Sequence, residues 1–276
     1  MNAAATYEWG RSAALRLGVL ALSAGTALAA AACSAGPVSV ASDPVAAVRN
    51  AAAVSAKIHT ARVATTVTMT VGGADRQFAG LGGFDFDKQV GAIILQTPRG
   101  AAELDEIVTP TTLYLRQAGM NAKWHRVDAT KLPDGDLISA GYTSPVFDFA
   151  LLRGVGQDEV HYAGQDKVRG TAVAHYTGTL DLTASAGQAQ NPIKGELLSA
   201  AHSFSQQTVP FDAYLDGQGK MRRMVAHFAF PAQAPEKGEV QIAATTDLFD
   251  LDRPVTVVTP HAQDVVVTPP GASSAH

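Results

Sequence analysis

Apolar and polar residues alternate with a period of two over much of this chain. Residues 61–71, ARVATTVTMTV, place one face of a strand on Val63, Thr65, Val67, Met69 and Val71. Such alternation, with many β-branched residues, is typical of a strand that is buried on one side. Phe78, Phe84 and Phe86 also share a parity, and the glycines between them predict a bulge or a sharply curved strand.

Short alternating segments separated by turns follow, at residues 90–96, 103–108, 112–117 and 123–128. Their spacing predicts an antiparallel meander. The second half predicts a long strand at 167–182, a β-hairpin at 209–230 and a further strand at 238–249. The hairpin turn is expected at DGQG, which starts at Asp216 and holds residues that tolerate a positive φ.

Three segments have helical rather than alternating spacing: residues 45–57, 146–154 and 195–206. Two of them follow a start signal, Asp43-Pro44 and Ser144-Pro145, in which a capping residue precedes proline. Antiparallel strands with a few packed helices make an α+β domain, so the sequence predicts that fold class.

The N-terminus has the layout of a secretory signal peptide. Arg11 and Arg16 precede an uncharged apolar core at residues 17–28, and four alanines lead to Cys33, the only cysteine. The apolar core is shorter than the roughly 20 residues that a transmembrane helix needs. We therefore expect this segment to be removed rather than to span the membrane.

Cys33 follows three alanines in a pattern that resembles a bacterial lipobox, although Ala30 stands where leucine is usual. The resemblance implies that the Cys33 sulfur is diacylated and anchors the protein to the extracytoplasmic face of the cell membrane. A plain signal peptide with an incidental cysteine is the alternative. We divide the chain into a signal peptide at 1–32, a tether at 33–43, one domain at 44–260 and a flexible tail at 261–276.

Composition narrows the choice of partners. A net charge of −4 with 17 % charged residues leaves no basic cluster for nucleic acid. A single cysteine excludes an intrachain disulfide and a cysteine-based zinc site.

Sequence motifs for catalysis are absent. None of the eight histidines has metal-ligand spacing, and the chain has no nucleophile elbow or phosphate-binding loop. Three carboxylates, Glu103, Asp105 and Glu106, cluster in one strand, and we interpret them as a solvated strand face rather than a glycosidase pair. The chain is accordingly expected to be no enzyme and to bind neither a metal nor a cofactor.

The segments VRGTAVAHYTGTLDL (168–182) and DAYLDGQGKMRR (212–223) carry a resemblance to a family. With the lipobox, helix and meander, they resemble actinobacterial envelope lipoproteins of the LppX/LprG type, which are similar in fold to the carriers LolA and LolB. Gly170 and Tyr176 match in the first segment, and Asp216 and Gly219 in the second. The resemblance implies a strongly curved antiparallel sheet, a half-barrel, with helices across its concave side.

The resemblance also implies an apolar cavity that holds acyl chains of a lipid or lipoglycan. The candidate lipid-binding residues are inward-facing apolar side chains: Val67, Met69, Phe78, Phe84, Leu113, Leu115, Tyr176, Phe211 and Phe228. The same residues would also face inward in a solid core, and alternation does not separate the two.

We therefore expect a membrane-anchored envelope lipoprotein that binds or transfers lipid. A LolA-like sensor or regulatory module that binds an envelope protein partner is the alternative. A structural lipoprotein with a filled core is a third possibility.

Overall fold

The computed structural model describes residues 38–98, 103–119, 122–132, 144–232 and 238–267. The described residues belong to one compact unit, which is separate from residues 1–34. Residues 1–37, which include Cys33, lie outside the described residues, so the signal peptide and the lipobox stay predictions. The expected loop at 132–143 lies outside them too, except for Leu132.

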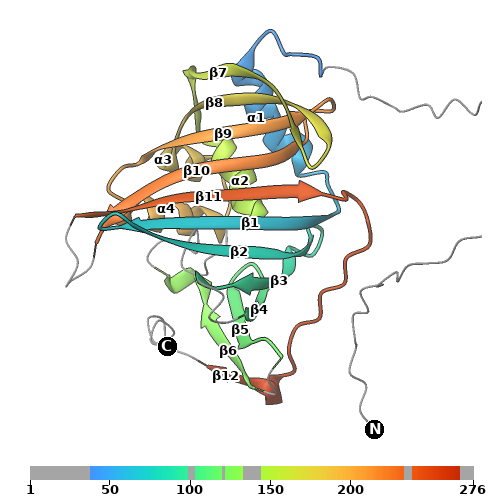
Figure 1. The fold of residues 1–276 in the computed structure, drawn as a ribbon, viewed down its shortest axis with the longest axis vertical. Helices are drawn as coiled ribbons and strands as arrows, with labels where there is room; N and C mark the ends of the chain where they lie inside the picture. Colours follow the sequence, from blue (N-terminus) through green and yellow to red (C-terminus); the bar gives the residue numbers. More distant parts are fainter. Residues whose placement is uncertain (1–37, 99–102, 120–121, 133–143, 233–237, 268–276) are drawn as a thin grey trace, which may run out of the picture. The chain divides into compact units, whose positions relative to one another are not determined.

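A single sheet contains all twelve strands of the described chain, in the order β12-β6-β5-β4-β3-β2-β1-β11-β10-β9-β8-β7 (Figure 1). Its strands are β1 (Thr60–Val71), β2 (Ala74–Asp85), β3 (Val90–Gln96), β4 (Glu103–Val108), β5 (Thr112–Gln117), β6 (Trp124–Asp128), β7 (Val155–Val168), β8 (Thr171–Asp181), β9 (Thr208–Asp216), β10 (Met221–Pro231), β11 (Glu239–Phe249) and β12 (Val265–Val267).

Two meanders make up this sheet. Strands β1 to β6 follow one another in order, as do β7 to β11, and the two meanders meet where β1 pairs antiparallel with β11. Only β12 runs parallel to its neighbour, β6. The two edge strands, β7 and β12, do not pair with each other, so the sheet is curved but open.

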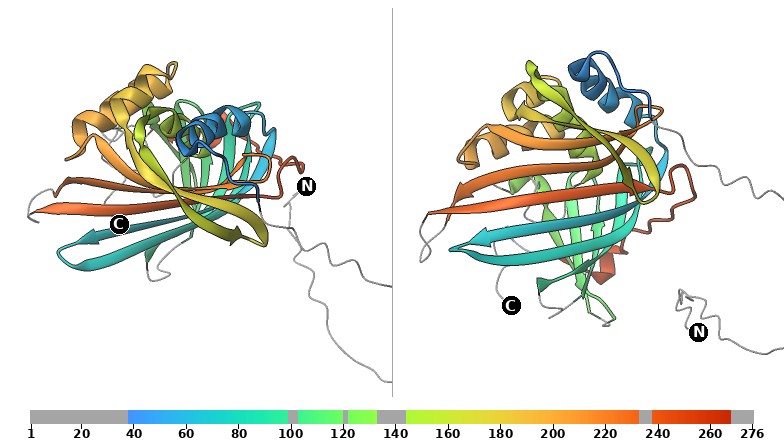
Figure 2. Two further views of the ribbon diagram at one scale, coloured as in Figure 1. Left: turned by 90° about the horizontal axis from the view of Figure 1, so that it is seen from above. Right: turned by 45° about the horizontal axis from the view of Figure 1, so that its top comes forward.

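The helices lie on one face of the sheet, which we call the inner face (Figure 2). They are α1 (Pro44–Ser55), α2 (Pro145–Leu151), α3 (Leu182–Gly187) and α4 (Ile193–Ser203). Within the described part of the chain, no helix has the length and apolar character that crossing a membrane requires.

Side-chain hydrogen bonds cap the start of α1 and also join this helix to strands of the sheet. The Asp43 carboxylate accepts from the Ala46 N–H at 2.9 Å, as the Asp43-Pro44 signal predicted. Arg49 donates to the Val155 carbonyl at 2.6 Å, and the Ser55 hydroxyl accepts from the Met221 N–H at 2.8 Å. Helices α2 and α4, in contrast, have no side-chain hydrogen bond at their N-caps.

One hydrophobic core fills the space between the inner face and the helices. Alternate residues of β1, such as Val63 and Val67, are fully buried there. Aromatic contacts join the helix side to the sheet side, because Phe149 of α2 stacks on Phe86 just after β2, and Phe204 just after α4 contacts Phe228 of β10. The apolar side of the alternating pattern in β1 is therefore the side that faces the core.

Glycine allows the sheet to bend where neighbouring backbones approach closely. A Cβ on Gly82 of β2 would collide with the backbone carbonyl of Ala92 on β3. A Cβ on Gly178 of β8 would meet the Glu159 carbonyl of β7 in the same way. The pairing of β1 with β2 runs without a register shift, so β2 is curved rather than bulged.

The α+β fold class and the curved antiparallel sheet are confirmed, as are the first meander and the hairpin of β9 and β10. The prediction of one strand at 167–182 is wrong. Arg169 and Gly170, both with positive φ, form a turn between β7 and β8. Strand β7 escaped prediction because an edge strand has one paired neighbour and carries many polar residues.

Two shorter elements also differ from the expectation. Helix α3 begins where the alternating pattern was expected to end, and the Asp181 carboxylate caps it by accepting from the Ala184 N–H at 2.6 Å. Residues 262–267, expected within a flexible tail, form a 3-10 turn and strand β12. Backbone pairing with β6 holds this segment although none of its side chains is buried.

Candidate functional site

All nine predicted lipid-binding residues lie on the inner face of the sheet. Those at most 2 % exposed are Val67, Phe84, Leu113, Tyr176, Phe211 and Phe228. The remaining three, Met69, Phe78 and Leu115, are half-buried. Across the strands Val67 faces Phe78, whereas Leu113 and Tyr176 lie on different meanders, so the set spans the inner face rather than one small site. Whether these side chains contact a lipid stays a prediction.

A small pocket opens into this interior. It lies between the end of β4, the start of α2 and the start of α4. Three of the residues that line it, Phe84, Val108 and Phe147, belong to the hydrophobic core. Its volume is about 30 Å³. One water molecule needs roughly 10–15 Å³, so the pocket accommodates a small group but not an acyl chain.

Glu196 brings a carboxyl group to that pocket from the first turn of α4. The residue is 4 % exposed, and its Oε1 atom has no hydrogen-bond partner within the described chain. Burial raises the pKa of Glu196 to about 7. At neutral pH the group is therefore close to the point where its protonated and ionised forms are equally populated.

Glu106 of β4 is buried more completely. Both of its carboxyl oxygens lack a partner in the described residues, and burial raises its pKa to about 8. On the inner face it stands between Ile93 of β3 and Leu115 of β5. The interpretation of this strand as a solvated carboxylate face is therefore wrong for Glu106, because the residue shares the inward parity of Leu104 and Val108.

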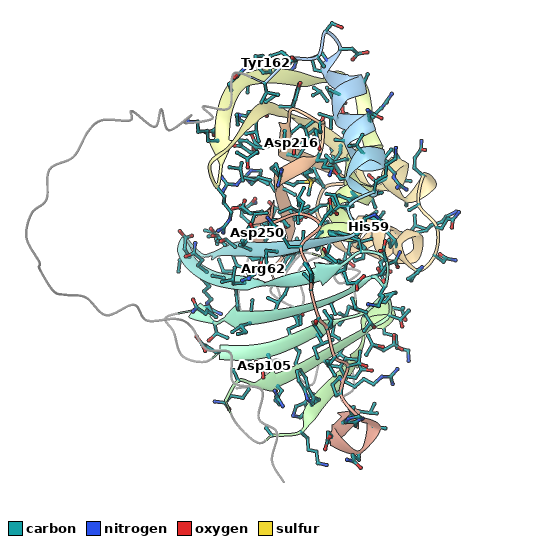
Figure 3. All side chains as sticks on the ribbon, turned by 90° about the vertical axis from the view of Figure 1, so that its right-hand side faces the viewer. His59, Arg62, Asp105, Tyr162, Asp216 and Asp250 are labelled. Carbon is teal, nitrogen blue, oxygen red and sulfur yellow. The ribbon has the colours of Figure 1, made fainter. Side chains whose placement is uncertain are left out.

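Asp105, the residue before Glu106, points to the other side of the sheet (Figure 3). There its carboxylate accepts from the Arg116 guanidinium at 2.6 Å. Asp247 on that outer face likewise accepts from Arg223 at 2.6 Å and from Arg169 at 3.1 Å. These two outer carboxylates thus have cationic partners, in contrast to Glu106.

A third buried acid lies on α2 above the centre of the sheet. Burial raises the pKa of Asp148 to about 7, and a hydrogen bond from the Thr246 hydroxyl opposes this shift to a smaller extent. Thr246 of β11 faces Thr65 of β1 across the seam of the two meanders. Asp148 Oδ2 and Thr65 Oγ1 have no partner in the described part of the protein.

The interior can therefore offer apolar surface together with a few hydrogen-bonding groups. A protonated carboxyl group donates one hydrogen bond and accepts others, which suits hydroxyl and carbonyl groups of a ligand. In residues 38–98, 103–119, 122–132, 144–232 and 238–267, no three His, Cys, Asp or Glu side chains are grouped so as to hold a metal ion.

The sequence pattern located the apolar residues of this interior but missed its acids. Parity along β4 could have identified Glu106. No such signal marks Asp148 or Glu196, because their burial depends on how short helices pack against strands that are distant in the sequence.

Neither protein-family models nor curated proteins match this chain. Solved structures do. LppX, a lipoprotein of Mycobacterium tuberculosis, is 13 % identical with a TM-score of 0.48, over 78 % of this chain and 97 % of LppX. LprF from Mycobacterium bovis is 14 % identical with a TM-score of 0.44, over 79 % of this chain and 96 % of LprF.

A LolA superfamily protein from Nitrosomonas europaea is 8 % identical with a TM-score of 0.34, over 76 % of this chain and 96 % of that protein. The solved structures to which the chain is similar thus include both kinds of protein that the sequence resemblance named, the lipoprotein LppX and a LolA superfamily protein.

Proposed function

We propose that this protein is an envelope lipoprotein that holds the acyl chains of a lipid or lipoglycan between the inner face of its sheet and its helices. It binds or transfers the lipid and performs no chemistry on it. Cys33, acylated at the extracytoplasmic face of the cell membrane, keeps the domain beside its source of lipid.

One observation carries the proposal: an apolar interior that contains buried polar groups without partners. Glu106, Asp148, Glu196 and Thr65 together have five such atoms in the described chain. Each buried group left unpaired costs about 1–3 kcal/mol, and native cores contain few of them. Such groups are better explained in an interior that opens and receives a ligand than in a permanently closed core.

The apolar inner face supplies the driving force for acyl chains. Each CH₂ group transferred from water to an apolar site contributes about 0.8 kcal/mol. A chain of sixteen carbons would gain roughly 12 kcal/mol before the costs of opening and of ordering the ligand. Since the pocket holds about 30 Å³, loading requires side chains or helices to move. The two helices without a side-chain N-cap, α2 and α4, are the ones beside the pocket.

The test is mass spectrometry of lipids extracted from the purified protein. The full chain carrying Cys33→Ala is used, so that no covalent acyl group contributes to the extract. A lipid class present in about equimolar amount supports the proposal. A protein that is empty, stays empty after incubation with envelope lipids and co-purifies with one envelope protein after crosslinking supports the partner-binding alternative instead.

A further inference from the structure

The pocket beside α2 and α4 is lined by apolar residues on some sides and by polar residues on another. Its apolar walls include Val108, Phe147 and Ile193, and its polar side carries Ser144 and Glu196. Because Phe84, Val108 and Phe147 belong to the core, a group that enters this pocket is continuous with whatever occupies the interior behind it.

Charge selects what the pocket can accept. Among the described residues that line it, Glu196 is the only ionisable one. A phosphate or carboxylate headgroup would enter without a cationic partner and beside a carboxyl group that is partly ionised at neutral pH. A hydroxyl group suits either form, since it donates to the carboxylate and accepts from the carboxylic acid.

Size narrows the ligand further. A volume of about 30 Å³ fits a single hydroxyl group with its carbon and excludes a whole sugar ring. The unpaired Oε1 atom of Glu196, on a residue that is 4 % exposed, is the acceptor or donor that such a hydroxyl would meet.

We propose that this pocket binds the free hydroxyl group of a neutral lipid through Glu196 and discriminates against lipids with an anionic headgroup. The inference rests on the proposed function and adds the class of lipid. Acyl chains would lie in the interior behind Phe84 and Phe147, with the hydroxyl end at the pocket.

A competition between two lipids with the same acyl chains tests this. The full chain with Cys33→Ala is delipidated and incubated with phosphatidylcholine vesicles that contain equal amounts of diacylglycerol and phosphatidic acid. The protein is reisolated, and the bound lipids are quantified by mass spectrometry. We expect diacylglycerol to exceed phosphatidic acid by about tenfold, because the hydroxyl gains a hydrogen bond whereas the phosphate meets a carboxyl group of the same charge.

Two substitutions separate binding from packing. Glu196→Leu removes the hydrogen bond and the charge, so the amount of bound diacylglycerol should fall several-fold. Glu196→Gln keeps the hydrogen bond without the charge, so diacylglycerol should remain within about twofold while phosphatidic acid rises. Glu103→Gln, on an exposed residue of β4, is the matched control and should leave the ratio unchanged.

The outcomes distinguish this inference from the function on which it rests. If the protein loads both lipids equally, or if Glu196→Gln keeps the full preference, the Glu196 inference is wrong and lipid binding stands. If the protein loads neither diacylglycerol, phosphatidic acid nor phosphatidylcholine, the proposed function itself is wrong.

Discussion

Glu106 and Asp105 are neighbours in the sequence with opposite surroundings. Asp105 pairs with Arg116 on the outer face, while Glu106 is enclosed between Ile93 and Leu115. Burial without a partner raises the pKa of Glu106, which means that ionising this carboxyl group destabilises the folded protein.

Replacing Glu106 by leucine should therefore stabilise the closed fold. At pH 8.5 we expect Glu106→Leu to raise the free energy of unfolding by about 1–3 kcal/mol, because an apolar side chain removes the desolvated carboxyl. Urea denaturation measures the change. Asp105→Leu serves as the control and should be neutral or destabilising by up to about 1 kcal/mol, since it breaks a half-exposed ion pair. A loss of stability in Glu106→Leu would contradict the buried, unpartnered description.

A substitution at Met69 tests whether lipid contacts the inner face without replacing a fully buried core residue. It is half-buried on the inner face, whereas Thr68 points to the outer face of the same strand. Met69→Trp should reduce lipid loading several-fold by filling the interior, and Thr68→Trp should not, as measured by mass spectrometry of extracted lipid. Circular dichroism checks that both variants fold. Unchanged loading in a folded Met69→Trp protein would count against contact between this face and lipid.

At the scale of elements, local pattern predicted most strands and failed for three segments. Strands such as β1, β10 and β11 bury one side, so their alternation is visible in the sequence. Strand β7 is an edge, α3 is six residues long, and β12 has three residues held by backbone pairing with β6. These three elements are stabilised by contacts with other elements of the fold, and a local sequence pattern does not predict such contacts. The same holds for the candidate site. Its apolar residues could be predicted from strand alternation, whereas the burial of Asp148 and Glu196 depends on where the helices pack.

Curvature of β2 gives a prediction at this scale. Gly82→Ala should lower the free energy of unfolding by about 1–3 kcal/mol, because the new methyl group would strike the Ala92 carbonyl and push β3 away. Gly187→Ala is the matched control, as a Cβ there meets no atom within 4 Å. Thermal or urea unfolding compares the two. Equal stability of both variants would refute the close approach of β2 and β3 at this point.

For the molecule as a whole, three buried acids make stability depend on pH. The pKa values of Glu106, Asp148 and Glu196 are raised from 4.5, 3.8 and 4.5 to about 8, 7 and 7. Each group holds its proton more tightly when folded, so stability falls as pH rises from about 4 to about 8 and levels off above that range.

Acids with lowered pKa values do not offset this trend. Asp85 and Asp128, each paired with a lysine, contribute stability that is lost only at pH values below about 4. We therefore expect a higher urea midpoint at pH 5.5 than at pH 8.5, by an amount equivalent to a few kcal/mol. Glu106→Gln removes the carboxyl group whose pKa is raised most, so it is the control and should flatten the profile. An equal or higher midpoint at pH 8.5 would contradict the prediction.

Cys33 governs where the whole molecule resides. If Cys33 is acylated, Cys33→Ala should move the protein from the membrane pellet to the soluble fraction, which immunoblotting of fractionated cells detects. Two acyl chains suffice for stable anchoring, so the shift should be nearly complete. Retention in the membrane would remove the main support for the lipobox interpretation.

The pairing of β1 with β11 has a consequence for how this protein reaches its native state. β1 lies near the start of the domain and β11 near its end, yet they form the seam between the two meanders. Each meander can assemble from sequence neighbours, but the interior closes only when ends distant along the chain meet. Such high contact order slows folding, since the entropy of a long loop is lost before the contacts form. A chain under synthesis would therefore keep its apolar inner face exposed until residue 249 has emerged, and would need protection from aggregation until then.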